Sequence, residues 1–351
     1  MGVTGNSQPG ARRLAPGLSL RLRGLVPLAS AARQIGRRAF SSVERMSMLF
    51  FVLFFLFSLL FVDKFANPVN LTNILVECAD LIILSCGMTF VFMNGGIDFS
   101  VIATLGLGSI LGAKVMTMAG NPFLLAIIGV LVMLAVGIAL GALNGLAITL
   151  LRMPSFIATM ATQLIFSGLA LWYTQSATIG GLPAPFLSIG RGTLFGVQMP
   201  VFIMIAVVAV TAFVLHRTVL GRYIFAVGTN HRTSRISGIP VKRTIFTLFL
   251  FSGGLAAVSG IIMTSRSAAG MPALGKSMLM DVVAAVVIGG TSVTGGKGSI
   301  LGTVTGAILI VVLNNSLNLL GIEWYVINAL KGVMITLVAL LGVLRSAGER
   351  S

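Results

Sequence analysis

From residue 46 onward, long apolar segments alternate with short polar ones along the chain. Runs of about 20 apolar residues are the length that crosses the hydrocarbon core of a bilayer as a helix. The pattern therefore predicts an all-α, polytopic helical membrane protein with about ten transmembrane helices within 46–344. The predicted segments are 46–62, 74–94, 100–119, 122–150, 155–174, 198–216, 244–264, 278–293, 298–320 and 325–344.

The segment 217–243 is the longest polar stretch between these apolar runs. It carries six basic residues and no acidic one, and Gly228, Gly238 and Pro240 punctuate it. Lys and Arg resist translocation, so a basic connection of this length is expected on the cytoplasmic side. We predict that it is the docking surface for a soluble cytoplasmic partner.

The two ends of the chain are polar. Residues 1–45 contain eight arginines against one glutamate, and 345–351 form a short tail. The first segment is compatible with a cytoplasmic tail, a basic helix on anionic lipid or a mitochondrial presequence, and we favour the tail. Since the basic residues concentrate in alternate loops, we expect both ends in the cytoplasm.

Composition supports this picture. The chain of 351 residues is 56% hydrophobic and 9% charged, and a soluble domain of that kind would expose large apolar patches. The 42 glycines fit close helix packing in lipid. The net charge of +16 resides in the tail and the predicted loops without interleaved aromatic residues, so nucleic acid is not an expected partner. Cys78 and Cys86, on one predicted helix, are expected to be packing residues.

A faint internal repeat divides the chain into two halves. The stretches 89–113 and 284–307 each contain an apolar run, a Gly-Gly pair, a polar turn and a second apolar run rich in Gly and Ala. Paired glycine-interrupted segments are a sequence indicator of a transport pathway. Similar composition of glycine-rich loops explains the likeness equally well. On the ten-helix map both interruptions face the cytoplasm.

Charged residues inside predicted membrane segments each require a reason. Glu77, Asp80, Asp98, Asp281 and Lys331 are in or beside such segments. We expect Glu77, Asp80 and Asp281 close to helix ends, and Asp98 and Asp281 to cap helix N-termini. Lys331 is expected to pair with a carboxylate that the sequence does not identify.

Neutral polar side chains on predicted helices are candidates for a solute path. Helix-to-helix hydrogen bonding is the more probable role of any single member, whereas the group as a whole favours a lined cavity. Thr159 and Gln163 share a helix face, as do Asn314 and Asn318. Together with the two acids Asp98 and Asp281, the candidates are Asn94, Asn144, Thr159, Thr162, Gln163, Asn314, Asn315 and Asn318.

Enzymatic sites are poorly supported. Of the two histidines, His216 directly precedes the basic segment and His231 lies within it; no Cys/His set has metal-ligand spacing, and no cofactor is expected. The run at 289–299 has Thr291 where a phosphate-binding loop needs its first glycine, and Gly298 where it needs Ser or Thr. The chain is therefore not expected to hydrolyse ATP.

Several motifs in order resemble those of inner-membrane permease subunits of ribose/xylose/autoinducer-2-type sugar importers of the ATP-binding-cassette class. The resemblance covers about 46–344. It rests on NLTNIL (70–75), GMTFVFMNGGIDFSV (87–101), GALNGL (141–146), MPSFIAT (153–159), GRYIFAVGTN (221–230), SGIPVKR (237–243), DVVAAVVIGGTSVTGGKGSILGT (281–303) and LNNSLNLLGI (313–322).

The resemblance implies a bacterial inner-membrane permease that acts with a cytoplasmic ATP-binding subunit, a periplasmic solute-binding protein and a second permease copy. The segment 217–243 would meet the ATPase, through Arg222, Gly228, Asn230, Arg235 and Gly238. The family's usual Glu-Glu-Ala-Ala-Arg run is here His231 to Arg235, of which only the final Arg matches. Glu77 and Asp80 replace residues that are usually neutral.

Three hypotheses follow. The first is an importer permease for a sugar or polyol, driven by ATP on its partner and working by alternating access. The second is a secondary transporter that uses membrane carboxylates for ion coupling. The third is a membrane scaffold that recruits a partner through its basic segment.

Overall fold

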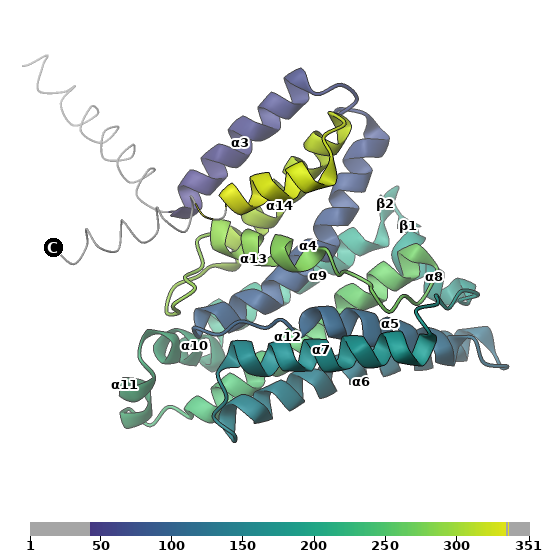
Figure 1. The fold of residues 1–351 in the computed structure, drawn as a ribbon. Helices are drawn as coiled ribbons and strands as arrows, with labels where there is room; N and C mark the ends of the chain where they lie inside the picture. The colour runs from purple at the N-terminus through teal and green to yellow at the C-terminus, as the bar shows by residue number, and fades with distance from the viewer. Residues whose placement is uncertain (1–42, 335, 337–351) are drawn as a thin grey trace, which may run out of the picture.

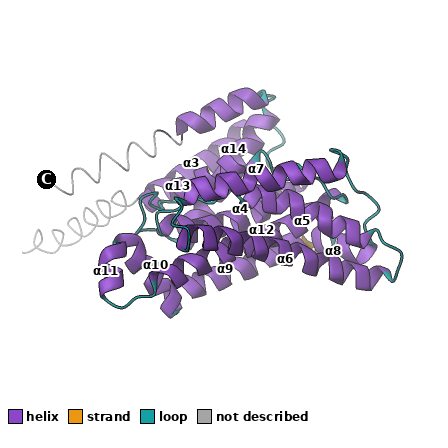
Figure 2. Cartoon of the chain, turned by 60° about the horizontal axis from the view of Figure 1, so that its bottom comes forward, coloured by secondary structure: helices purple, strands orange, loops and turns teal. Residues whose placement is uncertain are grey.

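The structure is a computed structural model that describes residues 43–334 and residue 336, with side chains from Met48 onward (Figure 1). Most of the predicted tail at 1–45 and all of 345–351 lie outside the described residues. Within the described part, nearly all regular structure is helical (Figure 2). The long helices are α3 (Val43–Phe61), α4 (Pro68–Met93), α5 (Val101–Met116), α6 (Pro122–Thr149), α7 (Ser155–Thr174), α9 (Met199–Arg217), α12 (Val241–Ser267) and α14 (Ile300–Leu319).

Helices α4 and α12 pack against each other at the centre of the molecule. Helix α12 also contacts α5 and α6, and α7 packs on that pair. Helix α4 also contacts α9, α14 and the shorter α13 (Met278–Ile288), and α3 packs on α14 (Figure 1). The two groups meet along α4 and α12, so any relative motion of the groups acts on this contact.

Six helices in the described part are long and apolar enough to cross a membrane: α4, α6, α7, α9, α12 and α14. Helix α13 has 11 residues, roughly 16 Å of length, about half of a hydrocarbon core. The backbone carbonyl groups at its carboxyl end must therefore find hydrogen-bond donors inside the protein or in water, because lipid offers none. Together these features confirm a polytopic helical membrane protein.

Several predicted boundaries were wrong by a few residues. Helix α4 begins at Pro68 instead of 74, because the Asn67 side chain accepts a hydrogen bond from the Val69 amide and Pro68 occupies the first helical position. Asp80 consequently lies in the middle of α4, not near its end as expected. The segment predicted at 325–344 is helical from Trp324 to Met334, and most of its remainder lies outside the described residues.

The connection between α7 and α9 contains structure that the sequence pattern did not predict. It forms helix α8 (Ala184–Arg191) and a short antiparallel hairpin whose strands, β1 (Thr193–Leu194) and β2 (Val197–Gln198), have two residues each. The Gly190 amide donates a hydrogen bond to Ser265 Oγ at 2.8 Å, which fixes α8 against the carboxyl end of α12.

The basic segment 217–243 is not a loop. It folds into α10 (Val219–Thr229) and α11 (His231–Ile236), and α12 already begins at Val241. Helix α10 packs against α4, α9 and α12, so the segment is attached to the centre of the molecule. The hydrophobic positions within it supply that attachment, while its arginines remain at the surface.

Candidate functional site

The two glycine-interrupted stretches of the internal repeat meet in space. The first interruption separates α4 from α5, and the second separates α13 from α14. The Gly296 amide in the second donates a hydrogen bond of 2.8 Å to the Met93 carbonyl at the end of α4. Gly95 and Gly296 both have positive φ, at 73° and 76°, a backbone conformation that glycine adopts without strain.

Helix α10 reaches this junction through Gly228. A Cβ atom on Gly228 would clash with the Met93 carbonyl oxygen and would lie 2.7 Å from the Gly296 amide nitrogen. The backbone of α10 therefore touches both interruptions at one point. A displacement of α10 is transmitted there by direct backbone contact, without an intervening flexible side chain.

The remaining residues proposed for docking have two kinds of role. Asn230 caps α11 by accepting a hydrogen bond of 3.0 Å from the Thr233 amide, and Gly238 takes a positive φ of 79° in the turn that follows. Arg222 and Arg235 are exposed, as are Arg232 and the apolar Ile236. We define the coupling surface as Arg222, Arg232, Arg235 and Ile236.

Asp98, in the first interruption, is fully buried and accepts three hydrogen bonds. Its Oδ1 accepts from the amide and the hydroxyl of Ser100, at 3.0 and 2.5 Å. Its Oδ2 accepts from the Ser252 hydroxyl of α12 at 2.6 Å. Asp98 was expected to cap α5, but the cap position is Ser100, and Asp98 instead joins the interruption to α12.

The network continues into α6 and α7. Asn144 Nδ2 donates to Ser100 Oγ at 2.8 Å, and the Thr162 hydroxyl donates to Asn144 Oδ1 at 2.6 Å. The Thr159 hydroxyl is 3.1 Å from the Ile97 carbonyl. Asn144 and Thr159 are fully buried, so these side chains bond helices together and do not line an open cavity in this conformation.

Two further candidates do not join the cluster. Gln163 is half-buried one turn beyond Thr159, and Asn318 is exposed near the end of α14. Asn314 and Asn318, which were predicted to share a helix face, differ in their surroundings, since Asn314 is half-buried and donates to Asp281 of α13 whereas Asn318 is exposed. Sequence spacing gave the shared face but not what covers it.

A second polar cluster links α13 and α14 to the final described helix. Lys331 Nζ lies 2.7 Å from Asp281 Oδ1, and Asn314 Nδ2 lies 3.2 Å from Asp281 Oδ2. Asp281 stands in the first turn of α13 but does not cap it, since the cap position is Ser277. Asn315 exchanges hydrogen bonds of 2.8 and 3.0 Å with Asn70 of α4.

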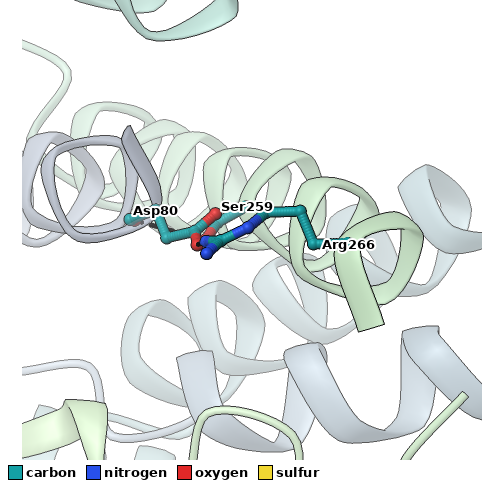
Figure 3. Close-up of polar contacts among 3 residues, drawn as sticks. All are labelled: Asp80, Ser259 and Arg266. Atoms are coloured by element: carbon teal, nitrogen blue, oxygen red, sulfur yellow. Dashed lines mark hydrogen bonds and ion pairs between the residues drawn. The ribbon is translucent and has the colours of Figure 1, made fainter. Parts of the chain in front are cut away.

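Arg266, in the last turn of α12, pairs with Asp80 (Figure 3). The pair joins α12 to the middle of α4, and the Ser259 hydroxyl donates to the Asp80 carbonyl at 3.2 Å. The aspartate side chain is 5% exposed and the arginine side chain 32%. The sequence signal for this pair was limited to two opposite charges in otherwise apolar segments.

Asn94 lies apart from these networks, in a pocket of about 160 Å³. The pocket is bounded by the first interruption, by Ile148 and Ser155 of α6 and α7, by Leu248 and Phe249 of α12, and by His231 of α11. Asn94 is 8% exposed, and its Oδ1 lacks a hydrogen-bond donor within the described part of the chain.

Comparison with known proteins decides the family. A family described as "Branched-chain amino acid transport system / permease component" matches residues 70–341. The chain belongs to this permease family.

Individual relatives cover most of the permease. The ribose import permease protein RbsC of Bacillus subtilis (strain 168) is 40% identical over 81% of this chain and 88% of its own. The D-allose transport system permease protein AlsC of Escherichia coli (strain K12) is 34% identical over 79% and 85%. The autoinducer 2 import system permease protein LsrD of Yersinia enterocolitica is 34% identical over 78% and 84%.

Proposed function

We propose that the permease is the membrane subunit of an ATP-binding-cassette importer for a sugar or a similar neutral polyhydroxylated solute. The observation that carries this is the backbone contact of Gly228 with Met93 and Gly296. It joins a basic surface suited to a soluble partner to both glycine interruptions of the transport domain. The ion-coupled alternative is weaker, because Asp80, Asp98 and Asp281 each already have partners in the described structure.

The solute class follows from the relatives and from chemistry. Those reported above are named for ribose, D-allose and autoinducer 2, whereas the family description names branched-chain amino acids. We infer a neutral polyhydroxylated solute, because a zwitterionic amino acid requires compensation for two charges inside the membrane. Among the candidate side chains, the neutral amides and hydroxyls match sugar hydroxyls.

The partners follow from this assignment. A cytoplasmic ATP-binding subunit docks on the coupling surface and hydrolyses ATP, a periplasmic solute-binding protein delivers the solute, and a second permease copy completes the membrane part. The permease resides in a bacterial inner membrane with both termini in the cytoplasm. ATPase closure displaces α10 and α11, and the Gly228 contact passes the displacement to the α4–α5 and α13–α14 interruptions.

The docking assignment is tested by charge reversal. Tagged permease is isolated from its native membranes in mild detergent, alongside a variant carrying Arg222→Glu, Arg232→Glu and Arg235→Glu. The matched control carries Lys114→Glu and Lys276→Glu, two exposed cations outside α10 and α11. An ATPase subunit is expected to co-purify with the wild type and the control and to be lost from the triple variant.

The outcomes separate the hypotheses. An ATPase that stays bound to the triple variant would contradict the coupling surface. If no ATPase accompanies the wild type under conditions that preserve other transporters, energy coupling by ATP is wrong and ion-dependent uptake becomes the leading mechanism. Solute-stimulated ATPase activity of the isolated complex distinguishes a transporter from a scaffold.

A further inference from the structure

Several described residues have a buried polar atom without a hydrogen-bond partner, and Asn94 is the one among them that lines the pocket described above. Asn94 Oδ1 has no donor in the described structure although the residue is only 8% exposed. A buried acceptor left without a donor is destabilising, and native proteins usually satisfy such groups with protein donors, water or a ligand. The residue, together with its neighbours Gly95 and Gly96, lines a space of about 160 Å³.

The groups that surround this space define the chemistry of its occupant. Asn94 offers an acceptor, and the Ser155 hydroxyl, which accepts from the Ile97 amide at 3.3 Å, retains its own proton for donation. His231 also lines the pocket, and its ring nitrogens can act as hydrogen-bond donor or acceptor. The apolar residues Leu248 and Phe249 also line the space. None of the described residues that line the pocket is Asp, Glu, Lys or Arg.

This combination fits a small neutral molecule with several hydroxyls and an apolar face. Its hydroxyls satisfy Asn94 and Ser155, while its C–H face packs on Phe249 and Leu248. An anion such as phosphate would lose its hydration here without an arginine or lysine to replace it. A wholly apolar ligand would leave Asn94 unsatisfied.

We propose that the pocket formed by Asn94, Ser155, His231, Leu248 and Phe249 is a binding site for the neutral polyhydroxylated solute, at the end of the transport domain next to the coupling surface. This inference rests on the proposed function and identifies where the solute is held before release. His231 belongs to α11, directly preceding Arg232 of the coupling surface. Movement of α11 by the ATPase therefore opens or closes the site itself.

Protection from thiol labelling tests the proposal. The variants are Ser155→Cys in the pocket and, as a second position should that one perturb folding, Ile245→Cys, which also lines it. Both are made in the complete transporter complex with Cys78→Ala and Cys86→Ala; the two native cysteines are buried. Ser188→Cys, on the exposed face of α8 away from the pocket, is the control.

The probes are D-ribose, D-allose, leucine and inorganic phosphate, added before a membrane-permeant maleimide. We expect one of the two sugars to slow labelling of the pocket cysteines about tenfold at ten times its dissociation constant, since protection follows the occupied fraction. Leucine, phosphate and the control position are expected to show no protection.

Uptake by the wild-type complex is measured with the same compounds. If a sugar is transported by the wild type and by a cysteine variant, yet does not protect either pocket cysteine, the site assignment is overturned and the transport function stands. Protection by phosphate or leucine alone would overturn the assigned ligand chemistry. If neither sugar is taken up by the wild type and neither protects, the proposed function falls, and the site assignment falls with it.

Discussion

At the scale of single residues, the Asp80–Arg266 pair has two unequal members. Asp80 is almost completely buried, whereas about one third of the Arg266 side chain is exposed. Removing one partner of a buried pair leaves the other charge uncompensated, and the penalty depends on whether that charge can reach water. The arginine can be hydrated after loss of the aspartate, but the aspartate cannot be hydrated after loss of the arginine.

Arg266→Met is therefore expected to destabilise the permease more than Asp80→Asn. Arg266→Met is expected to lower the free energy of unfolding by about 3 kcal/mol, and Asp80→Asn is expected to lower it by less. Thermal unfolding of the purified protein in detergent measures both, and the double variant should recover part of the Arg266→Met loss. Equal effects of the two single substitutions would contradict the burial argument.

Gly228 provides a second residue-scale prediction. Gly228→Ala forces the new methyl group against the backbone of Met93 and Gly296, with an expected destabilisation of about 1–3 kcal/mol. Gly254→Ala is the matched control, because a Cβ there meets nothing within 4 Å and alanine favours the interior of α12. Unfolding midpoints and ATPase co-purification are measured for both variants, and a control as damaging as Gly228→Ala would contradict this contact.

At the scale of elements, the Asp98 network holds the α4–α5 interruption against α6, α7 and α12. Asp98→Ala removes an acceptor from three buried donors, whereas Thr162→Val removes one donor at the edge of the network. Since each unsatisfied buried group costs about 1–3 kcal/mol, Asp98→Ala should lower the unfolding temperature substantially more than Thr162→Val. The same unfolding assay compares them, and a smaller effect of Asp98→Ala would show that the donors find other acceptors.

At the scale of the whole molecule, helix α12 runs from the coupling surface to the contact with α8. Ser237 lies just before α12 begins at Val241, and α8 is bonded at Gly190 to Ser265 near its other end. A 27-residue helix is roughly 40 Å long, enough to cross a bilayer. We therefore expect the two ends of α12 on opposite sides of the membrane.

Ser237→Cys and Ser188→Cys test this arrangement, in a background with Cys78→Ala and Cys86→Ala. A membrane-impermeant thiol reagent should label Ser237→Cys in inside-out vesicles and Ser188→Cys in right-side-out vesicles. The reverse pattern would place the basic segment outside and contradict docking of a cytoplasmic ATPase. Labelling of both positions in the same vesicles would contradict the transmembrane course of α12.

The sequence by itself determined the class of protein, because apolar runs of membrane-spanning length and a concentrated basic segment are local patterns. It also located the two glycine interruptions and the basic segment 217–243, whose role in docking stays a prediction. The apolar run alone misplaced Asp80, because the signals that start α4 at Pro68, an Asn cap and a proline, precede that run.

Only the tertiary structure decided which distant residues meet. Asp80 and Arg266 are 186 positions apart, and Met93 and Gly296 come from different halves of the repeat. Neither their spacing nor their local periodicity encodes such a contact, because it depends on how α4 packs against α12 and on the approach of two backbones. The same packing decided that Asn144 and Thr159 are satisfied within the protein, while Asn94 Oδ1 has no hydrogen-bond partner in the described structure.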